Sequence, residues 1–201
     1  MQRFLDAALE LVNNSATGKD FTVQEVVERS GQSLRSFYQY FGGKQELLMA
    51  LFEESVRSTA ELLHGKVAEE DDPLERLHRF VVECYRLCRP TGRGKGKGVR
   101  NRPTPAMAEI AQQLLTSQPS AAARAFVPLV ALFDEVYGDA VAAGVVRADL
   151  RRASVAGVVL EAIMFNAFSS TISASSTMAQ AGDPAEELWD VLVHGISAPP
   201  A

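Results

Sequence analysis

Apolar residues recur along nearly the whole chain at intervals of three and four positions, and no segment sustains an alternation of apolar and polar residues. This spacing collects apolar side chains on one face of an α-helix, whereas a half-buried strand would alternate. The pattern predicts helices over residues 4–14, 22–31, 33–41, 44–65, 72–88, 105–117, 120–143, 149–173 and 183–196. The sequence therefore predicts an all-α protein with three short helices, a linking helix and a larger helical bundle.

The ends of the second and third helices carry residues with capping chemistry. Thr22 and Glu25 have the spacing of a capping box, in which the threonine hydroxyl and the glutamate each satisfy a free amide. Gly31 supplies a left-handed stop for that helix, and Ser33 can cap the next one. The glycine pair at 42 and 43 then ends the third helix before a longer one begins.

Residues 22–41 have the spacing of a helix-turn-helix, which is a short helix, a tight turn and a second helix with outward polar side chains. Phe37 and Phe41 lie four apart, so they share a face and can anchor the second helix in a core. Tyr38 and Gln39 can reach phosphates and base edges, and Arg35 can donate two hydrogen bonds to guanine. A plain pair of packed helices would show the same glycine-broken pattern and is the alternative.

Composition indicates a globular chain and gives no sign of a membrane protein. Of the 201 residues, 47% are hydrophobic and 22% are charged, and no apolar run is long enough for a membrane span. The first twelve residues include Asp6 and Glu10, so they do not form a signal peptide. With only two cysteines, no disulfide framework is indicated, and we expect a cytoplasmic protein.

The net charge of −5 conceals an uneven distribution. Six basic residues and no acidic one lie between Arg89 and Arg102, which leaves 14 basic and 25 acidic residues elsewhere. Phosphate contacts depend on the local placement of cations and amides, so an acidic total does not exclude DNA binding. Glycine-alternating basic residues could enter a minor groove, but a solvated loop between two helices is the favoured interpretation of 89–102.

The segment "FTVQEVVERSGQSLRSFYQYFGGKQELL" resembles the DNA-binding segment of the tetracycline-repressor (TetR) family, and "FLDAALELV" resembles that family's first helix. The motif match covers about the first 50 residues, and beyond them only the helical architecture agrees. The resemblance implies a helix-turn-helix DNA-binding domain over 1–47 and a ligand-binding and dimerisation domain over 48–201. The departures from the family pattern are Gln32 in the turn, an apolar Leu34 at a position that is often polar, and Gly43 before Lys44.

The resemblance also assigns roles to individual positions. Thr22, Tyr38, Tyr40 and Lys44 match phosphate-contacting positions, and the variable positions on the third helix would read bases. The expected DNA-binding residues are Thr22, Gln24, Ser33, Leu34, Arg35, Ser36, Tyr38, Gln39, Tyr40 and Lys44.

The helix over 149–173 is apolar nearly all round, so it needs apolar neighbours on two sides. One neighbour is the protein's own core, and the other is expected to be a second subunit. The family resemblance implies a four-helix dimer interface from the last two helices of each subunit, and a dimer would read a palindrome. The expected interface residues are Ala156, Val159, Ala162, Asn166, Leu188, Trp189, Leu192 and Ile196.

The middle helices carry apolar and soft side chains with few charges among them. Such residues more often form a core than a pocket, but the family resemblance implies a small-molecule site in this part. We then expect an apolar effector, with Tyr85 and Asn166 as candidate polar contacts. The expected pocket residues are Cys84, Cys88, Met107, Ile110, Leu114, Phe126, Leu129, Phe133, Met164 and Phe168.

No sequence motif indicates an enzyme, a metal site or a cofactor. The three histidines are scattered, and neither a zinc-protease nor a nucleophile-elbow nor a P-loop motif occurs. Cys84 and Cys88 share a helix face without a third ligand, which favours two buried thiols over a metal or redox site.

We therefore predict a homodimeric, ligand-responsive transcriptional regulator, most simply a repressor, that binds a double-stranded DNA operator. The alternative is a helical interaction or small-molecule-binding protein whose helix-turn-helix is only structural.

Overall fold

The structure, a computed structural model, describes residues 1–14, 21–89, 105–172 and 182–196, with the side chains of 105–106 and 167–172 outside the description. These residues form helices and no strand, so the all-α prediction is confirmed. The helices are α1 Gln2–Asn14, α2 Val23–Ser30, α3 Leu34–Tyr40, α4 Lys44–Val67, α5 Pro73–Cys88, α6 Pro105–Ser117, α7 Pro119–Ala125, α8 Val127–Ala142, α9 Arg152–Ile172 and α10 Pro184–Ile196. Most of the basic loop expected over 89–102 lies outside the described residues.

The helix expected over 120–143 is two helices, α7 and α8, and this corrects the sequence prediction. The break falls at Phe126, whose backbone amide donates to the carbonyl oxygens of Ala123 and Arg124. Pro128 follows in the first turn of α8. Proline has no amide proton and its ring clashes with the carbonyl four residues earlier, so a continuous helix would be disrupted there.

The expected caps are present. The Thr22 hydroxyl accepts a hydrogen bond from the Glu25 amide at 3.2 Å, and a Glu25 carboxylate oxygen accepts one from the Thr22 amide at 2.7 Å. Gly31 ends α2 with a φ of 64°, which glycine adopts without steric cost. The Ser33 hydroxyl accepts from the Ser36 amide at 3.1 Å and so begins α3. These bonds fix the turn between α2 and α3.

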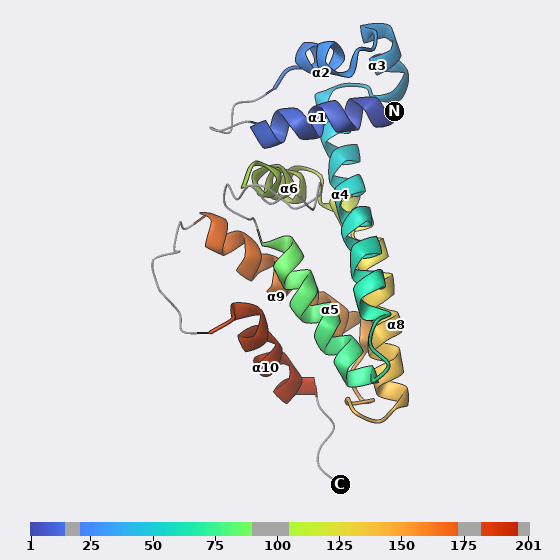
Figure 1. Cartoon of the computed structure of the whole chain (residues 1–201), viewed down its shortest axis with the longest axis vertical. Helices are drawn as coiled ribbons and strands as arrows, with labels where there is room; N and C mark the ends of the chain where they lie inside the picture. The colour runs from blue at the N-terminus through green and yellow to red at the C-terminus, as the bar shows by residue number, and fades with distance from the viewer. Residues whose placement is uncertain (15–20, 90–104, 173–181, 197–201) are drawn as a thin grey trace.

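Two clusters of buried side chains organise the fold. The first joins α1, α2, α3 and the start of α4, and its centre is aromatic, with Phe4, Phe37 and Phe41. The second joins the helices from α4 to α10, and its largest members include Phe80, Phe133 and Tyr137. Figure 1 shows α4 running from the first group of helices down beside α5, so it connects the two parts.

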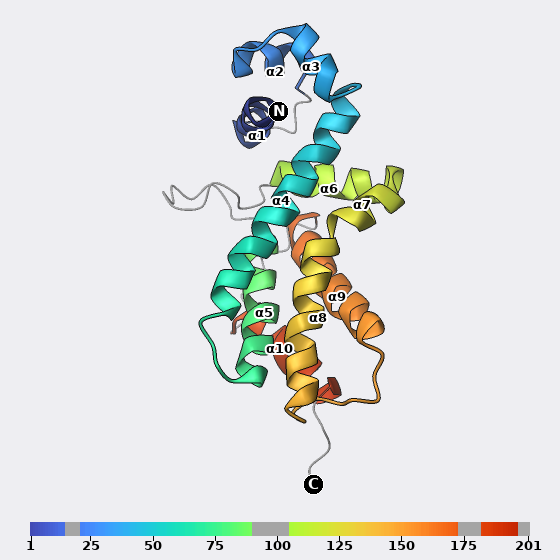
Figure 2. The same ribbon diagram turned by 90° about the vertical axis from the view of Figure 1, so that its right-hand side faces the viewer.

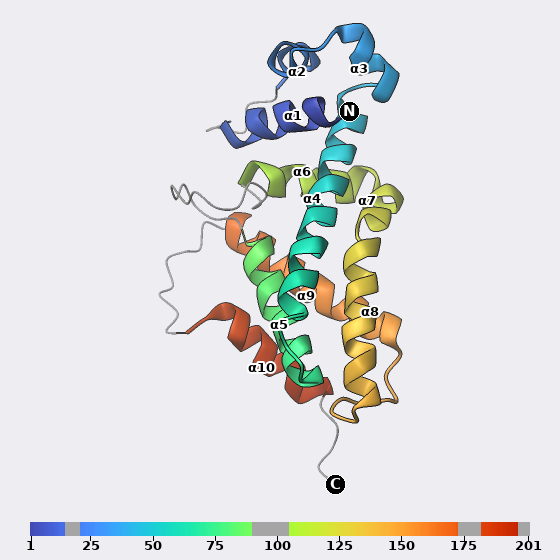
Figure 3. The same ribbon diagram turned by 45° about the vertical axis from the view of Figure 1, so that its right-hand side comes forward.

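Helix α6 lies between the two groups. In Figures 1 and 3 it runs beneath α1 and above the ends of α5 and α9, and Figure 2 shows it crossing α4. Met107 of α6 belongs to the first cluster, and Ile110 packs against both clusters. The amino-terminal helices therefore rest on the bundle through α6 as well as through α4.

Charged side chains fix α10 against α5. Arg86 contacts Asp183 at 2.5 Å, and the Nε2 atom of His78 lies 2.6 Å from a carboxylate oxygen of Glu186. Glu83 is nearly buried between Lys66 at 2.9 Å and Arg86 at 3.0 Å. Burial alone would raise the pKa of Glu83, but hydrogen bonds from those two cations outweigh it and lower that pKa. Glu83 thus carries its charge within a network that ties α4, α5 and α10 together.

None of the helices in the described part of the chain is both long and apolar enough to cross a membrane.

Candidate nucleic-acid interface and ligand pocket

Helix α3 presents a polar face to solvent and an aromatic face to the core. Arg35 and Gln39 are exposed, and the Tyr38 side chain is 58% exposed, whereas Phe37 is completely buried. Leu34 is half exposed at the first position of the helix. An exposed leucine at that position can contact a thymine methyl group, so it does not conflict with a major-groove helix.

Aromatic packing holds α3 in place. The Phe37 ring lies edge-on to the Phe4 ring of α1 at 5.5 Å between centroids, and 5.3 Å from the Phe41 ring. The Tyr38 ring lies 5.4 Å from the Phe37 ring, which braces a side chain expected to contact phosphate. The Tyr40 ring packs against Phe4 at 6.4 Å. Rigid support of this kind is what a recognition helix needs to keep its contacts in register.

The start of α4 adds a cation beside α3. The Nζ atom of Lys44 lies 4.6 Å from the centre of the Phe21 ring, a cation–π arrangement that positions the charge. Gly43 makes no side-chain cap for α4, and the Glu46 carboxylate accepts a hydrogen bond from the Gly42 amide at 2.7 Å.

The predicted DNA-binding residues occupy three adjoining segments, which are the start of α2, all of α3 and the start of α4. All are exposed except Ser36 and Lys44, which are partly buried. One of them has a competing partner, because the Thr22 hydroxyl donates to a Glu25 carboxylate oxygen at 2.9 Å. A phosphate contact by that hydroxyl would have to replace this bond.

An apolar pocket opens among α4, α5, α6, α8 and α9. The empty space in it is about 510 Å³ when the open mouth is included. The side chains around it are Phe52, Ser55, Val56, Thr59, Leu87, Cys88, Met107, Ala108, Ala111, Phe126, Leu129 and Met164. Two hydroxyls and one thiol are the hydrogen-bonding groups on the wall, so the pocket suits an apolar molecule with few polar atoms.

The structure divides the predicted pocket residues. Those that line the pocket are Cys88, Met107, Phe126, Leu129 and Met164. Cys84, Leu114 and Phe133 are buried in the second core cluster and Ile110 packs against both clusters, so these four do not line this pocket. The Phe168 side chain lies outside the described residues. Tyr85 and Asn166, the expected polar contacts, do not line it either. The polar groups are instead Ser55 and Thr59 of α4, a helix that the sequence presented only as a linker.

Some of the predicted interface residues are buried in the protein's own core, and others are partly buried or exposed. Ala156 and Val159 are 3% and 2% exposed within the protein's own core, which corrects their assignment to a surface. Ala162 is partly buried, and Asn166 is exposed with its side-chain amide donating to the Ala162 carbonyl oxygen at 2.8 Å. Leu188, Trp189, Leu192 and Ile196 of α10 are partly buried against the second cluster.

Sequence reasoning missed the apolar side chains of these helices that do face solvent. Val158 and Phe165 of α9 are 62% and 74% exposed, and Val191 of α10 is 72% exposed. Val158, Ala162 and Phe165 are spaced by four and three residues, so they form one stripe along α9. Within the described residues no group of three or more histidine, cysteine, aspartate or glutamate side chains could hold a metal ion.

Comparison with known proteins agrees with this geometry. Residues 4–51 match the sequence model of "Bacterial regulatory proteins, tetR family". The HTH-type transcriptional regulator BetI of Brucella anthropi is 25% identical over 81 residues, which are 40% of this chain and 41% of that protein. The aligned part is thus less than half of that relative's length.

Two solved structures share the fold over nearly the whole chain. The transcriptional regulator FadR of Bacillus subtilis, in complex with stearoyl-CoA, has a TM-score of 0.71 at 17% identity, covering 97% of this chain and 98% of that one. The fatty acid degradation regulator FadR of Bacillus halodurans has a TM-score of 0.70 at 16% identity, covering 96% and 93%. Residues 4–51 therefore match the helix-turn-helix segment of the bacterial tetR family, and the chain as a whole has the fold of the two FadR structures.

Proposed function

We propose that the chain is a ligand-responsive transcriptional regulator, a homodimeric repressor that leaves a palindromic operator when an apolar small molecule occupies the pocket. Residues 1–47 form its DNA-binding domain, and residues 48–201 form the domain that binds the ligand and dimerises. Members of this family are transcriptional regulators, which are generally not enzymes. The apolar pocket and the exposed polar face of α3 both support this function.

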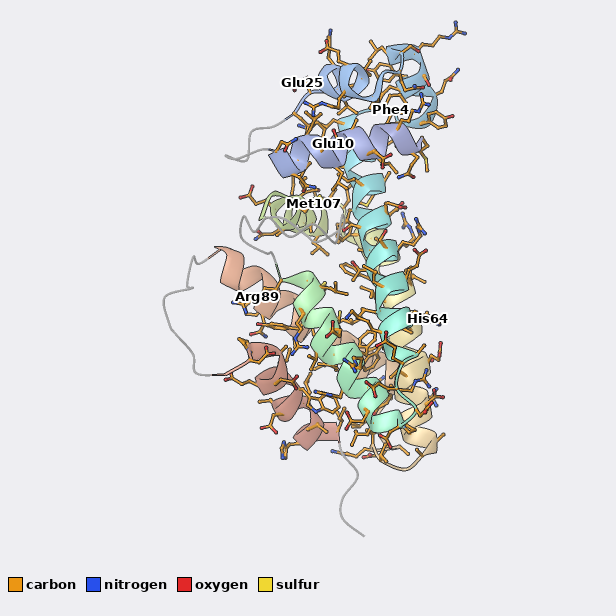
Figure 4. The ribbon with its side chains drawn as sticks, in the orientation of Figure 1. Phe4, Glu10, Glu25, His64, Arg89 and Met107 are labelled. Carbon is orange, nitrogen blue, oxygen red and sulfur yellow. The ribbon has the colours of Figure 1, made fainter. Side chains whose placement is uncertain are left out.

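The observation that carries the proposal is the position of Met107. Its side chain is buried, lines the pocket and also belongs to the core of the amino-terminal helices. Figure 4 places Met107 on α6 where that helix runs beneath α1. Because Phe4 of α1 packs on Phe37 of α3, a ligand that displaces Met107 changes the support of the recognition helix. The ligand then shifts the population toward conformers whose two α3 helices no longer match the operator.

Stearoyl-CoA is the first probe, because a structural relative binds it and this pocket is apolar. We expect the full-length chain to bind DNA from upstream of its own gene in the presence of excess random DNA, as measured by fluorescence anisotropy. Stearoyl-CoA should weaken that binding about 5–150-fold, the usual range of coupling between two sites. If binding does not exceed that to random DNA, the helix-turn-helix is structural only and the alternative interaction protein is favoured.

Met107→Ala tests the coupling itself. We expect the variant to bind operator and stearoyl-CoA, but the ligand-induced loss of operator affinity should shrink about threefold to tenfold, since residues between coupled sites contribute about 0.5–2 kcal/mol. Titrations of operator with and without ligand measure this. The matched control is Leu114→Ala, because Leu114 is buried on the same helix but touches neither the pocket nor the first cluster. Equal effects of the two variants would contradict the role of Met107.

Single substitutions in α3 and at the start of α4 should separate base reading from phosphate binding. Arg35→Ala should cost about 1–3 kcal/mol at the preferred site and relax the choice of base there, because a bidentate contact to guanine is lost. Tyr38→Phe and Lys44→Ala should instead weaken binding to specific and random DNA alike. Competition titrations with systematically altered operators measure both effects. Equal losses on specific and random DNA for Arg35→Ala would overturn its assignment to base reading.

A further inference from the structure

Cys88 places a nucleophile on the wall of the apolar pocket. It lies in the last turn of α5 and is partly buried, with Leu87, Met164 and Phe126 around the same cavity. Arg89, labelled at the end of α5 in Figure 4, is the next residue. The pocket also carries the Ser55 and Thr59 hydroxyls, but a hydroxyl without an adjacent base is a weak nucleophile. An apolar molecule that enters the pocket therefore meets one reactive side chain.

Cys84 lies one turn before Cys88 and is buried in the core away from the pocket. A hydrogen bond from the Cys84 thiol to the Cys88 sulfur lowers the pKa of Cys88 against the opposing effect of burial. The same hydrogen bond, together with burial, raises the pKa of Cys84. The pKa of Cys88 is thus the lower of the two, and the thiolate is the reactive form of cysteine.

A disulfide between the two cysteines is disfavoured by helix geometry. Side chains four residues apart on a helix have β-carbons about 5–6 Å apart. A disulfide requires about 3.5–4.5 Å between β-carbons. Closing it would distort α5, which packs against α4, α8, α9 and α10 through buried Leu77, Phe80 and Val81. Cys88 is therefore placed to react with a molecule from outside the protein.

We propose that Cys88 is a covalent capture site for apolar α,β-unsaturated carbonyl compounds that enter the pocket. In the reaction the Cys88 sulfur forms a bond to the β-carbon and the carbon–carbon π bond breaks. The electron pair passes to the carbonyl oxygen, and the proton lost by the thiol is replaced by one from solvent at the α-carbon. No oxidant or reductant is required. The inference rests on the proposed use of this pocket as the effector site.

Helix α4 offers a hydrogen-bond donor to the same pocket for the carbonyl group. The Thr59 hydroxyl already donates to the Ser55 carbonyl oxygen at 2.9 Å. The Ser55 hydroxyl donates to no group within the part of the chain that the structure describes. Ser55 can therefore donate to the carbonyl oxygen of a bound enal and stabilise the negative charge that forms there during addition.

Two aldehydes with the same reactive group test the site. The full-length protein at pH 7.5 is treated with trans-2-nonenal or with crotonaldehyde, and adducts are located by peptide mass mapping. We expect nonenal to label Cys88 at least about tenfold faster than crotonaldehyde, because its longer chain is buried in the pocket. Cys84 should remain unmodified in the folded protein. In urea both cysteines should react, and the preference for nonenal should disappear.

Variants separate the roles of the individual side chains. Cys88→Ser should abolish the adduct, and Ser55→Ala should slow its formation. Cys84→Ala should slow labelling about threefold to tenfold, because less of the Cys88 thiol is ionised without the donor. Cys84→Val, which better preserves core volume, should give the same slowing if the hydrogen bond rather than packing is responsible.

Equal labelling of both cysteines, equal rates for the two aldehydes, or no adduct on the folded protein would overturn the capture site. Operator binding measured without aldehyde tests the proposed function separately. A protein that binds operator and responds to stearoyl-CoA but does not capture nonenal would contradict this inference alone. A protein that captures nonenal but never binds operator would contradict the regulator instead.

Discussion

Phe37→Ala is expected to lower the free energy of unfolding by about 3–5 kcal/mol and to abolish operator binding. The ring is fully buried and packs against Phe4, Tyr38 and Phe41 at 5.3–5.5 Å between centroids. Its removal leaves a cavity under the seven-residue α3, which is too short to hold its shape without tertiary support. Thermal unfolding and anisotropy with operator DNA measure the two effects.

Phe133→Ala is the matched control, since Phe133 is equally buried but lies in the second cluster. It should destabilise the protein by a similar amount while the folded fraction keeps its operator affinity. Hydrogen exchange should locate the difference, with faster exchange of α3 amides in Phe37→Ala and not in Phe133→Ala. An unchanged operator affinity in Phe37→Ala would show that packing beneath α3 is not required for recognition.

Phe165→Asp is expected to dissociate the dimer and, with it, to weaken operator binding. Phe165 is 74% exposed on α9, on the same stripe as Val158. In a two-fold symmetric interface each substitution occurs twice. Losing the burial of two phenylalanines removes about 3–6 kcal/mol, which raises the dimer dissociation constant about 10²–10⁴-fold. Two recognition helices held about 34 Å apart read a palindrome, whereas a monomer contacts a single half-site.

Val127→Asp provides the control for this prediction, because Val127 is 59% exposed but lies at the start of α8. It adds the same charge in place of an exposed apolar side chain, and the protein should remain a dimer. Sedimentation at several protein concentrations separates the two outcomes. A monomer for both variants, or a dimer for both, would remove α9 from the proposed interface.

The start of the chain was predictable because its signals are local. The capping box of Thr22 and Glu25 spans four residues, and Gly31 and Ser33 mark the turn by their own conformational and hydrogen-bonding preferences. Phe37 and Phe41 face the core because their spacing puts them on one side of a short helix. The polar side of α3 followed from the same spacing, and the resemblance to the tetR family assigned the candidate DNA-binding residues. At Pro128, however, a long apolar pattern concealed a local break, and one predicted helix proved to be two.

The pocket and the subunit surface were not predictable in the same way. Phe52 and Val56 line the pocket, although they lie on α4, which the sequence predicted only as a linking helix. Phe133 read as a pocket residue and lies in the core. Whether an apolar face meets a side chain or a cavity depends on the distance to the facing helix, and packing between helices sets that distance.

Which side of α9 faces solvent was likewise not predictable from the sequence. It is apolar on nearly every side, so its sequence predicted two apolar neighbours without indicating which side faces the protein's own core. The tertiary structure placed Ala156 and Val159 inward and Val158 and Phe165 outward. The sequence by itself determined the helices, their caps and the polar face of the recognition helix, because those depend on contacts within a few residues. Only the tertiary structure decided the pocket wall and the exposed apolar stripe, because both depend on how separate helices pack.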